Sequence, residues 1–216
     1  MRNLKLAIVI VVALLTAAVF AKNIPSVSNY LTYLSLKWQY RNEKPLYLLP
    51  DQTRISGDDG GMRMTLDGWI KFEGDQAYRV DLALMRAVIM VESGFKPHAV
   101  TYRDGTIHYG LMQVPPAKEN LEEFLPKVGL TKPEDMFDLY HNFDWGTSRL
   151  SMYLFFYHGD VHSMLAIYHV GLEEFKRNSI TPETQRYIDR VLRYQKCFAE
   201  DPKWPATKSP EWCDHH

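Results

Sequence analysis

One segment of this chain has a helical pattern that ends on a charged residue. Apolar side chains recur at intervals of three and four residues from Leu82 to Ile89, and Asp75 or Asp81 would cap the helix that they predict. Glu92 continues the same phase, so we expect its carboxyl group on the buried face of this helix. A stretch rich in Gly, Pro and Asp follows, from residue 93 to 109. The pattern therefore predicts a buried carboxyl group at the end of a core helix.

The rest of the chain is also mainly helical in pattern. Further helices are predicted over residues 29–40, 115–129, 142–157, 161–170 and 183–196. Asp160 and the Thr181-Pro182 pair are typical helix starts, and Gly171 is a typical helix end. No segment repeats. We expect a mainly α domain, with a long loop or a small hairpin after the helix that ends at Glu92.

The N-terminus has the pattern of an export signal. A short basic start is followed by an uncharged apolar run from Leu6 to Phe20, and small residues lie where a signal peptidase would cleave. The run is shorter than the roughly 20 residues that a spanning helix prefers, which favours cleavage over an uncleaved inner-membrane anchor. We therefore interpret residues 1–21 as a signal peptide or signal anchor.

Charge and cysteine content narrow the class of protein. The 216 residues carry a formal net charge of -1 without a Lys/Arg run, so no nucleic-acid partner is predicted. The two cysteines, Cys197 and Cys213, suit an exported protein if they form a disulfide, which would contribute about 3 kcal/mol by closing a short C-terminal loop. Two free thiols are the alternative.

Glu92 has the properties of a general acid. Burial disfavours the charged form of a carboxyl group, so a Glu at the end of an apolar helix would keep its proton near neutral pH. Such a group can protonate the leaving oxygen in glycosidic cleavage. The alternative is an exposed Glu at a helix C-terminus, a position that disfavours anions.

Four motifs occur together in a fixed order. They are "ESGFKPHAVT" (Glu92–Thr101), "YGLMQV" (Tyr109–Val114), "LAIYHVG" (Leu165–Gly171) and "ETQRYIDRV" (Glu183–Val191). This series resembles the soluble lytic transglycosylases, with their goose-type lysozyme-like fold, and related small secretion-associated members. The resemblance covers about residues 78 to 196. It implies cleavage of the β-1,4 bond between N-acetylmuramic acid and N-acetylglucosamine, with formation of a 1,6-anhydro sugar.

The resemblance also implies roles for individual residues. Glu92 would act first as general acid and then as base towards the muramic 6-hydroxyl group. The residues predicted to contact the substrate or to shape its groove are Thr101, Gln113, Tyr168, His169, Glu183 and Tyr187. Thr101 would hydrogen-bond near Glu92 or the acetamido group of the substrate, and Tyr168 would orient Glu92 or that acetamido group. Gln113 would offer a donor and an acceptor to the sugar. Met112 is interpreted as a core residue.

Three features depart from the family pattern. The usual Ser nine residues after the Glu is Thr101, which keeps a hydroxyl group. The following loop is longer and more polar, as in transglycosylases attached to secretion and conjugation systems. The Asn of the family's Ala-Tyr-Asn motif is His169, whose imidazole can titrate.

The predicted organisation has four parts. A signal peptide or anchor (1–21) precedes an N-terminal extension (22–68), a lysozyme-like catalytic domain (69–196) and a C-terminal tail (197–216). No cofactor or metal is predicted: a helix break is expected between His158 and His162, and the terminal Asp-His-His has too few ligands. The expected partner is the peptidoglycan glycan strand in the periplasm, and a membrane or envelope-machinery partner is a further option.

Two other functions stay open. A goose-type lysozyme-like hydrolase would need a second carboxylate to hold water, and Asp104 or Asp144 are the candidates. A non-catalytic peptidoglycan-binding or scaffold protein is the other alternative.

Overall fold

The structure is a computed structural model of the whole chain. It describes residues 25–46, 54–56, 63–72, 77–103, 105–115, 130–178, 180–201 and 212–213. The predicted signal segment (1–21), nearly all of the predicted helix over 115–129 and the terminal Asp-His-His lie outside the described residues. In the described part, no helix is long and apolar enough to cross a membrane.

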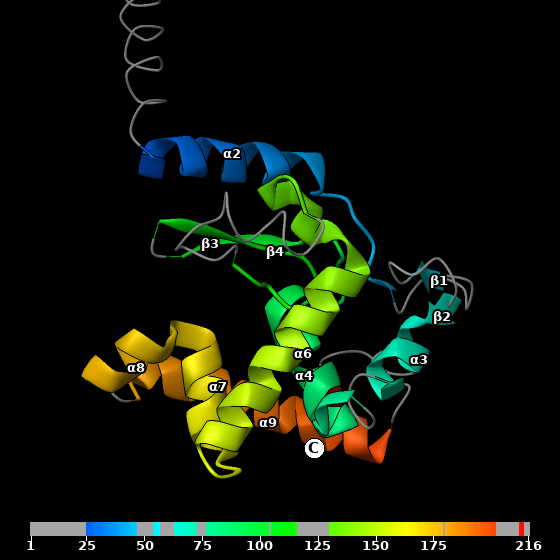
Figure 1. Cartoon of the computed structure of the whole chain (residues 1–216), viewed down its shortest axis with the longest axis vertical. Coiled ribbons are helices and arrows are strands. Elements are labelled where there is room, and N and C mark those ends of the chain that lie inside the picture. Colours follow the sequence, from blue (N-terminus) through cyan, green and yellow to red (C-terminus); the bar gives the residue numbers. More distant parts are fainter. Residues whose placement is uncertain are drawn as a thin grey trace, which may run out of the picture.

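Helices make up most of the described chain (Figure 1). In chain order the elements are α2 (Pro25–Gln39), β1 (Arg54–Ser56), β2 (Arg63–Thr65), α3 (Leu66–Lys71), α4 (Leu82–Ser93), β3 (Val100–Arg103), β4 (Thr106–Tyr109), the 3-10 helix η3 (Pro133–Phe137), α6 (Leu139–Phe156), α7 (Val161–Val170), α8 (Leu172–Asn178) and α9 (Pro182–Glu200). The two short sheets are antiparallel hairpins, β1–β2 and β3–β4. The predicted mainly α fold with a small hairpin is confirmed.

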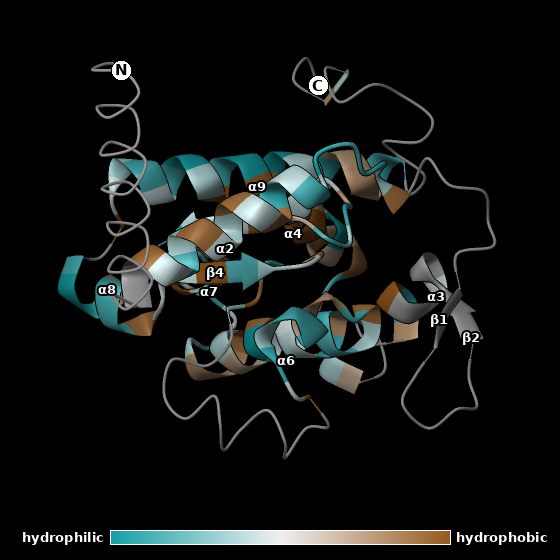
Figure 2. Ribbon diagram, turned by 90° about the horizontal axis from the view of Figure 1, so that it is seen from above, coloured by the Kyte–Doolittle hydropathy of each residue, from teal (hydrophilic) through white to brown (hydrophobic). Residues whose placement is uncertain are grey.

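The apolar helix α4 is the central element of the domain. Leu84, Met85, Val88 and Ile89 are almost fully buried, and Glu92 is buried with them. The long helix α9 packs along α4, and in Figure 2 most of α9 has the colour of hydrophilic residues, whereas α4 has that of hydrophobic residues. The buried phase predicted for Glu92 is therefore confirmed.

Local capping sets where α4 begins and ends. The Asp81 carboxylate accepts a hydrogen bond from Leu84 N at 2.7 Å, which satisfies one of the free N–H groups of the first turn. Gly94 ends the helix with φ of 60°, a left-handed conformation that glycine adopts without steric cost. Because the helix ends two residues after Glu92, the carboxyl group lies where the chain turns towards β3.

Most of the predicted helix bounds agree with the structure. The helix predicted over 161–170 is α7, with Asp160 as its N-cap and Gly171 at its end. Thr181 caps α9 and Pro182 is its first residue, as predicted. The pattern missed the short helices α3 and α8, which have too few residues for a clear apolar period.

The hairpin β3–β4 forms the long loop after α4. Val100 pairs with Tyr109 at the open end, and Arg103 pairs with Thr106 next to the turn that joins the two strands. Thr101 and Arg103 are two residues apart on β3, so their side chains share one face of the hairpin. Helix α2 lies over this hairpin (Figure 1).

The C-terminal segment is attached to α9. Cys197, near the end of α9, forms a disulfide with Cys213, with Cα atoms 5.9 Å apart, and both residues are buried. This pairing joins the tail to the core helix pair.

Candidate active site

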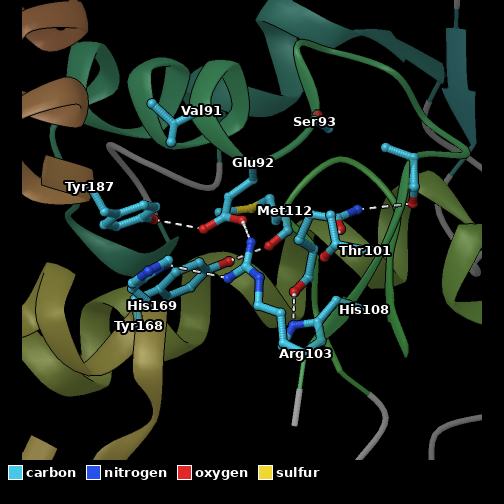
Figure 3. A network of polar contacts seen from close by, with 12 residues as sticks. Val91, Glu92, Ser93, Thr101, Arg103, His108, Met112, Tyr168, His169 and Tyr187 are labelled. Atoms are coloured by element: carbon cyan, nitrogen blue, oxygen red, sulfur yellow. Dashed lines mark hydrogen bonds and ion pairs between the residues drawn. The ribbon is translucent and has the colours of Figure 1, made fainter. Parts of the chain in front are cut away.

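Both carboxylate oxygens of Glu92 are hydrogen-bonded by side chains from other elements (Figure 3). The Tyr187 hydroxyl of α9 donates to Oε1 at 2.7 Å. The Arg103 guanidinium of β3 donates from Nη2 to Oε2 at 2.8 Å. The Glu92 side chain is only 1% exposed. Three elements that are distant in sequence therefore converge on this one carboxyl group.

Arg103 is held on its other side by His169. Arg103 Nη1 lies 3.4 Å from His169 Nδ1, and the His169 ring stacks on the Tyr187 ring with centroids 4.2 Å apart. Burial opposes the charge on Arg103, but the adjacent Glu92 carboxylate outweighs this, and the pKa of Arg103 is raised above its usual range. Arg103 therefore stays charged beside Glu92.

His169 is neutral in this environment. Burial first, and then the charges of Arg103 and Arg190, lower the pKa of His169 from 6.5 to about 4. The imidazole expected to titrate near neutral pH is thus uncharged there. A neutral ring can accept a hydrogen bond at Nδ1, which suits its position next to the guanidinium.

Tyr187, and not Tyr168, is the tyrosine that bonds to the Glu92 carboxyl group in this structure. Burial and the nearby Glu92 charge raise the pKa of Tyr187 well above its usual value, so its hydroxyl remains a donor. The Tyr168 hydroxyl instead donates to Met112 O at 2.7 Å, and it fixes the loop after β4. The two tyrosines have similar chemistry, and only the packing of α7 and α9 separates their roles.

Gln113 and Thr101 bond to each other and do not reach Glu92. Thr101 Oγ1 donates to Gln113 Oε1 at 2.7 Å, and Gln113 Nε2 donates to the carbonyl oxygens of Ala99 and Gly110. Gln113 is only 3% exposed. Its amide group therefore has its hydrogen bonds within the protein. The motif suggested a contact between Gln113 and the sugar. We propose instead that Gln113 positions the hairpin.

Asn142 is a buried polar residue that sequence reasoning missed. Its Oδ1 accepts a hydrogen bond from Met112 N at 2.8 Å, and its Nδ2 donates to Tyr109 O at 2.7 Å and to Met136 O at 2.9 Å. The loop that carries Met112 is thus bonded to α6. Met112 itself is fully buried, as predicted.

A cleft of about 1170 Å³ lies beside these residues. Its lining includes Arg103, Trp145, Arg149, Tyr168, His169 and Glu183. Glu92, Thr101, Gln113 and Tyr187 are not part of the lining. Of the predicted site residues, the structure thus brings Tyr168, His169 and Glu183 to the cleft surface and places the others behind it.

The described residues contain no candidate metal site. No group of three or more His, Cys, Asp or Glu side chains there could hold a metal ion. His158 and His162 lie on either side of the break between α6 and α7.

The residues that form this site lie in a segment that matches a known domain family. Residues 70–189 match the family model of the transglycosylase SLT domain, which is more than half of the chain and includes every residue that contacts Glu92. The chain belongs to the transglycosylase SLT domain family.

Curated relatives and solved structures are similar to this SLT domain. Membrane-bound lytic murein transglycosylase C from two strains of Klebsiella pneumoniae is 30% identical over 141 residues, which are 56% of this chain and 38% of that protein. The match thus spans little more than a third of the relatives' own length.

The structural likeness concerns the fold. The 70-kDa soluble lytic transglycosylase of Escherichia coli aligns with a TM-score of 0.51 at 21% identity, over 64% of this chain and 25% of that one. A complex of the 70-kDa soluble lytic transglycosylase with bulgecin A aligns with a TM-score of 0.52 at 20% identity, over 62% and 24% of the two chains. The lysozyme-like fold of the SLT domain is therefore shared.

For the glycan cleavage that the family resemblance implies, Tyr187→Phe is expected to lower kcat/KM by about 10- to 100-fold. The change removes one hydrogen bond to a charged carboxyl group, which is worth about 1.5 to 3 kcal/mol. Tyr153→Phe is the matched control, because Tyr153 is a buried tyrosine of α6 with no bond to Glu92. Equal rates for the two variants, measured with peptidoglycan as substrate, would contradict the orienting role of Tyr187.

His169 is expected to make the domain less stable in acid. Its pKa of about 4 in the folded state is below the value of 6.5 for an unfolded His, so the unfolded chain binds more protons. The stabilisation is complete above pH 6.5 and is lost as the pH falls through 4. Because the ring is partly exposed, we expect a loss of about 1 kcal/mol.

Urea unfolding of the wild type and of His169→Asn at pH 7 and at pH 4.5 tests this expectation. Asn does not titrate, so the difference in unfolding free energy between the two proteins should change with pH. A difference that is the same at both pH values would show that His169 is not the group responsible.

Proposed function

We propose that this protein is a peptidoglycan lytic transglycosylase. It would cleave the β-1,4 bond between N-acetylmuramic acid and N-acetylglucosamine and leave a 1,6-anhydro-N-acetylmuramic acid end. The observation that carries the proposal is Glu92: a single carboxyl group at the end of an apolar helix, oriented by Tyr187 beside a large cleft in an SLT domain.

Glu92 would carry both proton transfers. In the first step it gives its proton to the glycosidic oxygen, and in the second it takes the proton of the muramic 6-hydroxyl group, which attacks the anomeric carbon. No water is consumed. The cation between the two steps would be stabilised by the N-acetyl group of the substrate, so a second carboxylate is not required.

The contacts of Asp144 support this scheme over hydrolysis. A hydrolase of the usual type needs a second carboxylate across the groove. Asp144 accepts a hydrogen bond from the Tyr78 hydroxyl at 2.5 Å and does not line the cleft. The other candidate, Asp104, lies outside the described residues.

The substrate contacts follow from the cleft lining. Tyr168, His169 and Glu183 would contact the glycan strand directly. Thr101, Gln113 and Tyr187 would act behind them, by holding the hairpin and the carboxyl group in place.

We also propose that the protein works in the cell envelope, where peptidoglycan is found. The export pattern of residues 1–21 and the likeness to an enzyme named as membrane-bound support this location. Residues 1–21 would be either a cleaved signal or an inner-membrane anchor, and an envelope or secretion complex is the expected assembly partner. Sequencing the N-terminus of the mature protein distinguishes the two states.

Muropeptide analysis tests the proposed reaction. Purified protein is incubated with peptidoglycan, and the released fragments are identified by mass spectrometry. Anhydro ends are expected. Reducing ends would mean a lysozyme-like hydrolase, and the absence of any release would favour a non-catalytic binding protein.

A further inference from the structure

Arg103 lies between the proposed acid and the cleft. Its guanidinium lines the cleft and is 27% exposed, whereas the Glu92 side chain is 1% exposed and does not line it. Figure 3 shows the Arg103 side chain extending from β3 to the Glu92 carboxyl group, below Tyr187 and beside His169. A glycosidic oxygen in the cleft would therefore meet Arg103 before it meets Glu92.

This ion pair conflicts with the first proton transfer. A general acid must carry a proton, but a guanidinium has only N–H donors, so it cannot accept a hydrogen bond from a carboxyl O–H and it pairs most strongly with a charged carboxylate. The other oxygen of Glu92 already accepts from Tyr187. Arg103 must therefore leave Oε2 before Glu92 can hold a proton there and present it to a substrate.

The departing guanidinium needs a new anion. An unpaired charge in a partly buried site is costly, and a second carboxylate would replace the first at little electrostatic cost. Three carboxylates of the protein line the cleft with Arg103, and each already has a stabilising partner. Glu173 and Glu174 of α8 are paired with Lys176 and Arg177. Glu183 lies in the first turn of α9, where the helix N-terminus favours a negative charge. His169 cannot supply a negative charge, because an imidazole is either neutral or cationic.

The muramic acid unit of a glycan strand carries suitable anions. Its lactyl group ends in a carboxylate when the strand has no peptide, and the stem peptide brings carboxylates of its own when it is attached. N-acetylglucosamine has none. Among the two sugars of the strand, only the muramyl unit can therefore offer Arg103 a replacement for Glu92.

We propose that Arg103 is a carboxylate-binding specificity residue that covers Glu92 until a carboxylate of the muramyl unit displaces it. In the free enzyme Arg103 pairs with Glu92. When a muramyl unit enters the cleft, Arg103 binds the substrate carboxylate and leaves Oε2 of Glu92, which then faces the glycosidic oxygen. This inference rests on the proposed function, because it names the part of the substrate that starts the reaction.

The test compares substrates with and without carboxylates. Peptide-free strands and peptide-bearing strands are each assayed before and after conversion of their carboxylates to neutral methylamides. The wild type is expected to lose about 10- to 100-fold in kcat/KM on amidation, the value of one charge-assisted contact. The peptide-free strands report on the lactyl carboxylate alone, and a loss confined to the peptide-bearing strands assigns the contact to the stem peptide.

Arg103→Gln should remove this discrimination. The ratio between native and amidated strands is expected to fall close to one, and amidated strands should be cleaved faster than by the wild type because Glu92 is no longer covered. Arg149→Gln is the matched control, since Arg149 lines the same cleft without bonding to Glu92, and it should keep the wild-type ratio. A wild-type ratio near one, or the same ratio in Arg103→Gln, would overturn the proposal.

A binding measurement separates this proposal from the proposed activity. The Arg103 Nε–Hε resonance, assigned by its absence in Arg103→Gln, is followed by NMR during titration with N-acetylmuramic acid and, as control, N-acetylglucosamine. We expect the Arg103 Nε–Hε resonance to shift with N-acetylmuramic acid and not with N-acetylglucosamine. An equal response to both sugars would refute the carboxylate contact even if the enzyme cleaves peptidoglycan, and a selective shift would support it even if cleavage takes another course.

Discussion

Glu92→Gln is expected to lower kcat/KM for peptidoglycan cleavage by about 10³-fold. General acid–base catalysis contributes about 10² to 10⁴ in rate, and here one group would serve as both acid and base. Gln has nearly the same shape, and its oxygen can still accept the Tyr187 hydrogen bond, so the domain should fold. The amide has no proton of suitable acidity, and the first step is therefore lost.

The matched control for this variant is Glu173→Gln. Glu173 also lines the cleft, but its carboxylate is exposed and pairs with Lys176 at the protein surface. We expect this variant to lose far less activity than Glu92→Gln, because an exposed, paired carboxylate is not positioned to transfer the proton. If Glu92→Gln and wild type released muropeptides equally, Glu92 would not be the catalytic group and the non-catalytic alternative would be favoured.

Gly110→Ala is expected to lower the free energy of unfolding by about 3 kcal/mol. Gly110 has φ of 76°, in the left-handed region where a Cβ costs about 1 to 2 kcal/mol. A Cβ at this position would also lie 2.5 Å from Asn142 Nδ2. Asn142 is fixed by three buried hydrogen bonds, so it cannot move away without breaking one of them, and overpacking adds about 1 to 3 kcal/mol.

Gly105→Ala separates these two costs. Gly105 has the same φ of 76°, but no atom lies within 4 Å of the Cβ position. We expect a loss of about 1 kcal/mol from the backbone alone. Urea denaturation of both variants measures the difference. If both variants lost the same free energy of unfolding, the loop that carries Gly110 would have moved away from Asn142. The close approach of Gly110 to Asn142 would then not determine the position of that loop.

Local patterns were sufficient for much of the helical framework. The caps Asp81, Asp160 and Thr181 act within three residues of their own positions, so their partners can be inferred from spacing alone. The burial of Glu92 follows from helical phase in the same way. The division at residue 69 stays a prediction, although the family model begins at residue 70.

Contacts between distant segments could not be inferred in this way. Tyr187 is 95 residues from Glu92, and Gln113 meets Thr101 across the hairpin. The motifs gave Tyr168 a contact with Glu92 or with the acetamido group, and they gave Gln113 a contact with the sugar. In the structure Tyr187 bonds to Glu92, and the Gln113 amide bonds to protein groups. Those assignments depend on which side of a helix or loop faces the cleft, and that is decided by packing.

Arg103 is the clearest example of a contact that could not be predicted from the sequence. Its place on β3, two residues after Thr101, was a usable signal once a hairpin was expected, because both side chains share one face. An apolar helix that buries one carboxyl group could be predicted from local sequence, since helical periodicity and caps act over a few residues. The pairing of this carboxyl group with a guanidinium that covers it could be seen only in the folded domain, because the pair forms only when the turn after α4 folds β3 back over the helix end.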